Sequence, residues 1–217
     1  MIMKYSFIAG SKGRIVLALV MLCSASSALA IDTPAYSVMN SDFFGFDSPV
    51  TVGFKSTAES ASNLTALDYH DEDLDGLFNA HDVGRYDLSG TLPATATVPD
   101  GAAGDLIGEY RYATLGSVYA LAAGTQSVLA DHASAGDGYR YSNAPPTTLT
   151  VNPMISIGDN ASLYSYGPML VFPAASIGYD LYATPNMRLY PVPEPETYAL
   201  LLVGLGLIGF TLSNKKA

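Results

Sequence analysis

The chain has 217 residues, of which 20 are acidic and 10 are basic, so its formal net charge is −10 at pH 7. This charge disfavours nucleic acid and anionic membrane surfaces as partners, because both repel an acidic protein. The single cysteine excludes an intramolecular disulfide, and the length suits one domain with a sizeable core.

The N-terminal 30 residues have the pattern of a secretory signal peptide. Basic residues precede the apolar stretch Ile15 to Cys23, and Ala28 and Ala30 meet the small-residue requirement of signal peptidase. We therefore expect signal peptidase to cleave after Ala30, so that the mature chain begins at Ile31 and is exported across the inner membrane.

Residues 31–190 predict one all-β domain, built as a β-sandwich or jelly roll. Tyr, Thr and Val are frequent, turn residues interrupt them, and no long segment repeats apolar residues at the helical period. In residues 91–98 apolar and polar side chains alternate, as in a half-buried strand, and Pro93 favours an edge position. Residues 132–147 predict a long surface loop, because Gly, Ser, Asn and Pro dominate them. The predicted strands are residues 43–46, 50–55, 64–69, 83–88, 91–98, 108–115, 118–121, 126–130, 149–157, 168–172 and 177–183.

Segment 64–130 contains short motifs in a defined order. They are Thr65-Ala66-Leu67 with Tyr69, Asp75-Gly76-Leu77, His81 with Val83-Gly84, and Gly90-Thr91-Leu92 with Ala94. In this order they resemble a β-sandwich domain of unknown function that recurs in exported bacterial proteins. Asp68, Arg85 and Pro93 depart from the usual pattern. The resemblance implies a fold and brings no established activity with it.

An acidic loop, residues 71–82, lies between two predicted strands and is the best candidate for a functional site. Carboxylates occupy its first, third and fifth positions, glycine the sixth and an amide the ninth, which is the spacing of a calcium loop. The twelfth position holds aspartate in place of the longer glutamate, and strands flank the loop where an EF-hand has helices. Calcium is therefore a candidate ligand, and a solvated acidic loop is the alternative. The candidate metal ligands are Asp71, Asp73, Asp75 and Asp82, with Gly76 at the turn and Asn79 at the ninth position.

The sequence contains no Gly-x-Ser-x-Gly, His-Glu-x-x-His or phosphate-binding glycine motif. His70, His81 and His132 are interpreted as structural, with His81 placed to brace the acidic loop. Repeated Arg-Tyr pairs suit sugar recognition, but neighbouring strand residues point to opposite faces, so several tyrosines are expected to fill the core. A cleft holding two carboxylates of perturbed pKa would instead favour a glycan-active hydrolase.

Residues 191–217 form a tail with three parts. Prolines flank Val192 and Glu194 in the run 191–195, which keeps the backbone extended and accessible to a processing enzyme. The apolar run 199–212 predicts a helix of about 21 Å, short against the roughly 30 Å of membrane hydrocarbon. Lys215 and Lys216 follow as a basic stop on the cytoplasmic side. A buried helix of the globular domain is the alternative, although a core helix normally shows a polar face.

This tail resembles the PEP-CTERM sorting signal of exported Gram-negative bacterial proteins. The run Val192-Pro193-Glu194-Pro195, the short membrane helix and the terminal lysines carry the resemblance. It implies transient anchoring in the inner membrane, tail processing by an exosortase, and a final place at the cell surface or in the extracellular matrix, where exopolysaccharide is a candidate partner. The expected function is that of a non-catalytic surface or matrix protein, with a secreted glycan-active hydrolase as the alternative.

Overall fold

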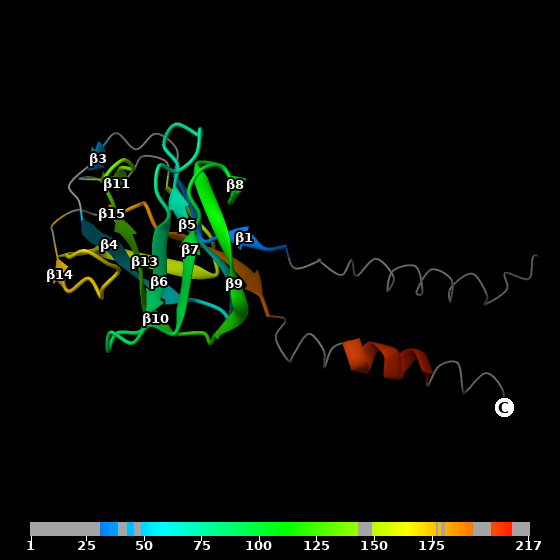
Figure 1. Ribbon diagram of the computed structural model, residues 1–217. Helices are drawn as coiled ribbons and strands as arrows, with labels where there is room; N and C mark the ends of the chain where they lie inside the picture. Colours follow the sequence, from blue (N-terminus) through cyan, green and yellow to red (C-terminus); the bar gives the residue numbers. More distant parts are fainter. Residues whose placement is uncertain are drawn as a thin grey trace, which may run out of the picture. The chain divides into compact units, whose positions relative to one another are not determined.

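The computed structural model describes residues 31–38, 43–45, 49–142, 149–176, 178, 181–192 and 201–209 (Figure 1). Between residues 31 and 192 the described residues form strands, turns and bends without a helix. The all-β prediction is therefore confirmed. The predicted signal peptide, including Ala28 and Ala30, lies outside the described residues.

The described part of the chain contains sixteen strands. In chain order they are β1 (Thr33–Pro34), β2 (Tyr36–Val38), β3 (Phe43–Gly45), β4 (Val50–Ala58), β5 (Ser62–His70), β6 (His81–Tyr86), β7 (Ala94–Val98), β8 (Asp105–Ile107), β9 (Tyr110–Leu121), β10 (Gln126–Ala133), β11 (Tyr139–Ser142), β12 (Leu149–Val151), β13 (Ile155–Tyr166), β14 (Ala175–Ser176), β15 (Leu181–Tyr182) and β16 (Asn186–Pro191).

Two larger sheets contain most of these strands. One has the order β1-β16-β5-β9-β8 and the other the order β14-β13-β4-β10-β6-β7, and two small sheets contain β15-β11-β3 and β12-β2. The larger sheets share one apolar core, in which Leu64 and Leu67 of β5 and Leu189 of β16 belong to the same cluster as Phe54 of β4 and Leu129 of β10. Burial of these side chains from both sheets supplies the main driving force for their association.

Tyrosines contribute much of this core, and Tyr36 and Tyr110 satisfy their hydroxyl groups at its margin. The ring of Tyr36 packs edge-on against Phe54 and Tyr110, with centroid separations of 5.6 and 5.9 Å. The Tyr36 hydroxyl donates to the carbonyl of Pro185 at 2.7 Å, and the Tyr110 hydroxyl donates to that of Ala183 at 2.8 Å. Each ring buries apolar area while its polar end keeps a partner. The expectation that tyrosines fill the core is confirmed.

The structure differs from the predicted surface loop at residues 132–147. Strand β10 continues to Ala133, and β11 occupies Tyr139–Ser142, while residues 143–148 lie outside the described part. β11 pairs with β3 and with β15, which are both distant in sequence. Pairing between distant segments therefore outweighs the local glycine and asparagine signals.

Other strand predictions hold in part. β7 begins at Ala94, directly after Pro93, and lies at the edge of its sheet as predicted. The predicted strands at 108–115 and 118–121 form a single strand, β9. Residues 168–172 form no strand, and instead Leu170 and Phe172 pack over a buried apolar cluster. Here the apolar pattern reflects packing of an irregular segment and not sheet pairing.

A helix covers residues 201–209, within the predicted apolar helix 199–212, whose other residues lie outside the described part (Figure 1). Among the described residues, none of the helical segments has the length and apolar character needed to cross a membrane. Lys215, Lys216 and residues 193–195 of the predicted sorting motif also lie outside the described part.

Candidate functional site

The acidic loop leaves the end of β5 and turns sharply back toward β6. The amide of Asp71 donates to the carbonyl of Glu109 at 2.8 Å, so the pairing of β5 with β9 extends into the loop. Leu74 and Gly76 have positive φ values of 66° and 117°. A side chain at Gly76 would collide with the backbone of Gly101, so glycine is required where the loop returns.

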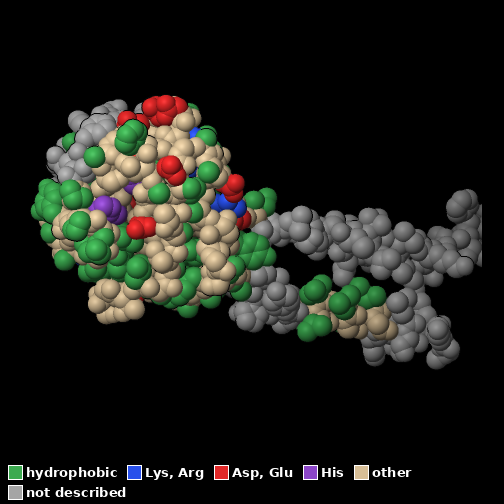
Figure 2. Space-filling model, viewed as in Figure 1, with side chains coloured by type: hydrophobic (Ala, Val, Ile, Leu, Met, Phe, Trp, Pro, Cys, Tyr) green, Lys and Arg blue, Asp and Glu red, His purple; other side chains and the backbone are tan. Residues whose placement is uncertain are grey.

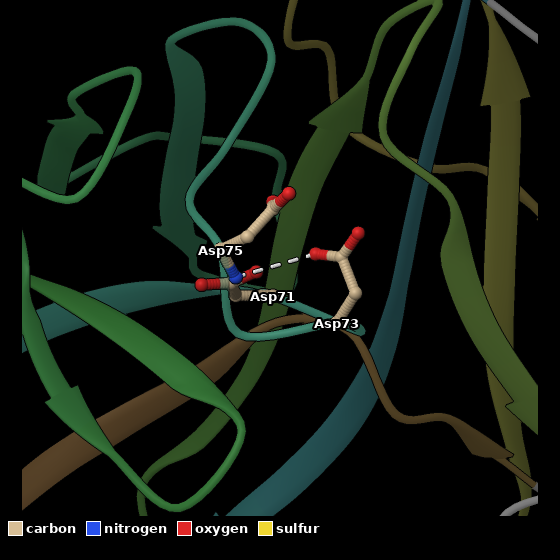
Figure 3. Close-up of side chains that lie close together, drawn as sticks. All are labelled: Asp71, Asp73 and Asp75. Atoms are coloured by element: carbon tan, nitrogen blue, oxygen red, sulfur yellow. Dashed lines mark hydrogen bonds between the residues drawn. The ribbon is translucent and has the colours of Figure 1, made fainter.

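Three carboxylates converge in this loop. Ligand atoms of Asp71, Asp73 and Asp75 all lie within 4.8 Å of one another. Figure 3 shows the three side chains projecting from the same loop, with the amide of Asp75 donating to Oδ1 of Asp73 at 3.4 Å. A hydrogen bond with Asp73 and the negative charge of that residue raise the pKa of Asp75. The loop therefore concentrates negative charge that a cation would relieve.

Arg111 on β9 already neutralises one of these carboxylates. Its Nε donates to Oδ2 of Asp71 at 2.5 Å, and the two side chains are only 4% and 1% exposed. Oδ1 of Asp71 accepts the amide of Leu74 at 3.1 Å. Asp71 is therefore held in place by a buried ion pair, and the guanidinium weakens the attraction of the loop for a metal ion.

The structure brings Asp71, Asp73 and Asp75 together but leaves Asp82 apart. Asp82 lies on β6, where its Oδ1 accepts the hydroxyl of Thr97 on the neighbouring strand at 2.7 Å. Asn79, at the ninth loop position, donates its side-chain amide to the carbonyl of Ala135. The twelve-residue coordination pattern of an EF-hand is therefore not formed by the described residues.

Asp137 holds the segment that follows the acidic loop. Its carboxylate accepts the backbone amides of Phe78 and Asn79 at 2.8 and 2.9 Å, and it contacts Nε2 of His81 at 2.8 Å. Nδ1 of His81 contacts the carbonyl of His132 at 2.9 Å. Both ring nitrogens thus contact oxygen atoms of other residues. His81 braces this segment, as the sequence predicts.

The acidic loop and the segment 136–138 line a cavity of about 340 Å³. Its carboxylates belong to Asp71, Glu72, Asp73, Asp75 and Asp137. His70 adds no positive charge, because burial and then the charge of Arg140 lower its pKa to about 3. Figure 2 shows acidic side chains gathered over the loop after β5. The cavity is therefore suited to a cation or to a ligand rich in hydroxyl groups.

Glu72 and Asp75, whose pKa values are raised, line this cavity, and two further carboxyls with raised pKa values lie in the core, away from its lining. Burial raises the pKa of Asp68 on β5 and of Asp131 on β10 well above the ordinary value, and the charge of Asp68 adds to the effect on Asp131. Among the described residues, neither carboxyl oxygen of Asp131 has a hydrogen-bond partner. Because a substrate cannot reach fully buried groups, this pair does not form the cleft expected of a hydrolase.

Asp131→Asn is expected to raise the melting temperature by several degrees at pH 7 and to leave it nearly unchanged at pH 3. Burial raises the pKa of Asp131 in the folded protein. Above pH about 4, the carboxyl of Asp131 therefore loses its proton in the unfolded chain but keeps it in the folded state. The free energy of unfolding therefore falls as the pH rises from that value toward the folded-state pKa. Asparagine resembles the protonated acid and has no proton to lose.

Thermal unfolding at both pH values measures this difference. Asp100→Asn, in an exposed turn, is the matched control and should change the melting temperature little at either pH. Equal shifts at pH 3 and pH 7 for Asp131→Asn would show that the protonation of Asp131 is not responsible.

The sorting motif begins where the last strand ends. Pro191 is the final residue of β16 and pairs with Ser62 of β5, and the amide of Val192 donates to the carbonyl of Ala61 at 3.1 Å. No linker therefore separates the sheet from the motif.

Comparison with known families agrees with both parts of the chain. Residues 38–184 match a family described as a domain of unknown function (DUF4082), and residues 191–216 match the PEP-CTERM protein-sorting motif. No curated protein and no solved structure matches significantly. The motif is that of exported proteins sorted to the cell surface by an exosortase, and neither family description names a reaction. Because the first match spans more than half of the chain, the protein belongs to the DUF4082 family and carries a PEP-CTERM sorting motif.

Proposed function

We propose that this protein is a non-catalytic component of the cell surface or extracellular matrix. Signal peptidase removes residues 1–30, the β domain of residues 31–190 folds as a sandwich outside the inner membrane, and the tail 191–217 anchors it there transiently. An exosortase then processes the tail. The observation that carries this proposal is the sorting motif at residues 191–216, directly after the last strand of the domain.

Within the tail, we assign recognition by the exosortase to Val192, Pro193, Glu194 and Pro195. Because proline fixes φ and removes a backbone donor, the sequence predicts an extended run here, whose backbone and carboxylate a membrane enzyme can read. Lys215 and Lys216 supply the basic stop that retains the C-terminus on the cytoplasmic side until the tail is cut.

Cell fractionation of a host with and without its exosortase tests this proposal. With the exosortase, the protein should appear at the surface or in the medium. Without it, the protein should remain in the inner membrane fraction at a larger mass. Surface delivery that is equal in both hosts would contradict sorting by the exosortase.

The acidic loop is proposed as a low-affinity calcium site formed by Asp71, Asp73 and Asp75. The close approach of their ligand atoms and the raised pKa of Asp75 support this assignment. The pairing of Asp71 with Arg111 keeps the affinity low.

Calcium at a hundred times its dissociation constant is expected to stabilise the domain by about 2.7 kcal/mol, because it binds only the folded state. Thermal unfolding with millimolar calcium and with chelator measures the effect. The double variant Asp73→Asn and Asp75→Asn should lose this response, whereas Asp82→Asn should retain it because Asp82 lies apart from the loop. A melting temperature indifferent to calcium would show that the loop is only solvated.

The same cavity is the proposed contact for exopolysaccharide. Phe78, which lines the cavity, is 75% exposed, and sugar rings stack on aromatic faces of this kind. Neighbouring carboxylates can accept hydrogen bonds from sugar hydroxyls.

A further inference from the structure

The beginning and the end of the folded domain lie side by side in one sheet. β1 forms the sheet edge and pairs antiparallel with β16, with Thr33 opposite Leu189 and Pro34 opposite Arg188. The amide of Ala35 donates to the carbonyl of Met187 at 2.7 Å. Because the strands are antiparallel, the chain enters β1 at the same end of the sheet at which it leaves β16 (Figure 1).

A polar cluster of Asp32, Thr65, Asp105 and Arg188 stabilises this edge of the sheet. Nε and Nη2 of Arg188 lie 2.9 and 2.7 Å from Oδ2 of Asp32, and the Thr65 hydroxyl donates to Oδ1 of Asp32 at 2.8 Å. Nη1 of Arg188 also lies 3.3 Å from Asp105. Asp32 is the second residue of the mature chain expected from the signal peptide. The mature N-terminus therefore secures the strand that leads into the tail.

The sheet extends into the sorting motif itself. The matched motif starts at Pro191, which is still paired with β5, and Val192 still donates its amide to Ala61. Glu194 follows Val192 by only two residues in the sequence. An enzyme that grips an extended peptide over several residues would meet the folded domain at this point.

We propose that the pairing of the end of β16 with β5, secured by β1 on the other side of β16, restrains tail processing, with Asp32 as a positioning residue. While β16 is fully paired, its end and Val192 are withheld from the exosortase, and processing proceeds when this end frays. Proline at position 191 has no amide to donate, so few hydrogen bonds oppose the fraying. This inference rests on the proposed sorting by an exosortase.

Insertion of Gly-Ser-Gly-Ser between Val192 and Pro193 tests the proposal. The insertion follows the last sheet contact, so the melting temperature should not change, while the rate of tail processing should rise several-fold in a pulse-chase experiment. The same insertion between Ala102 and Ala103, in an exposed turn, is the control and should leave the rate unchanged. Asp32→Asn, which weakens the polar cluster, should also accelerate processing but by less.

A rate that is unchanged or slower after the insertion at Val192 would overturn the restraint, even if the wild-type tail is processed normally. A wild-type tail that is never processed would instead contradict the sorting proposal, and the restraint would fall with it. The pulse-chase experiment therefore separates the two claims.

Discussion

Arg111→Met is expected to lower the free energy of unfolding by about 3–5 kcal/mol, because it leaves the buried carboxylate of Asp71 without its ion-pair partner. The cost should be high here, since Asp73 and Asp75 place further negative charge within a few ångströms. Methionine keeps most of the apolar stem of arginine, so packing changes little and the lost charge pair dominates.

Urea or thermal unfolding of the purified domain measures this loss. Arg188→Met is the matched control, because the Arg188 pair with Asp32 is more exposed and should contribute about 1 kcal/mol or less. Adding Asp71→Leu to Arg111→Met should recover much of the stability, because no buried charge is then left unpaired. If Arg111→Met lowered the free energy of unfolding no more than Arg188→Met does, water would have to reach Asp71 and replace the arginine as its partner.

Glu194→Gln is expected to abolish tail processing while leaving folding and signal-peptide removal intact. Between Pro193 and Pro195, Glu194 supplies the one backbone amide donor and the one ionised side chain of an extended run. An exosortase that reads many unrelated proteins has little else to recognise, so the carboxylate should make a charge-assisted contact with a basic group. Glutamine keeps the size and extension of glutamate but removes the charge.

Immunoblots of inner membrane fractions should show the uncleaved precursor of Glu194→Gln accumulating. Glu196→Gln, outside the pair of prolines that flank Glu194, is the matched control and should be processed nearly as well as wild type. Normal processing of Glu194→Gln would assign recognition to the apolar segment and lysines alone.

The sequence predicts strands well where a local pattern agrees with distant pairing. β7 alternates in sequence and begins after Pro93, so its edge position follows from local chemistry. β16 also alternates, with Met187 and Leu189 next to Asn186 and Arg188, but the predicted strands end at residue 183. Its place is fixed by β1 and β5, more than a hundred residues earlier. Such pairings depend on the whole chain and leave little trace in a short window.

The candidate site likewise contains residues that could be predicted from the sequence and residues that could not. The spacing of Asp71, Asp73 and Asp75 is local, so their convergence could be predicted. Arg111 and Asp137 were not identifiable, because they meet Asp71 and His81 from 40 and 56 residues away. For Asp137, the only local signal is its position between Gly136 and Gly138.

Intact mass spectrometry of the protein recovered from the surface of its native host tests the central claim most directly. The account predicts a chain that begins at Ile31 and lacks the C-terminal part of the tail, including Lys215, Lys216 and Ala217. A surface protein that retains Lys215-Lys216-Ala217 would contradict processing by an exosortase.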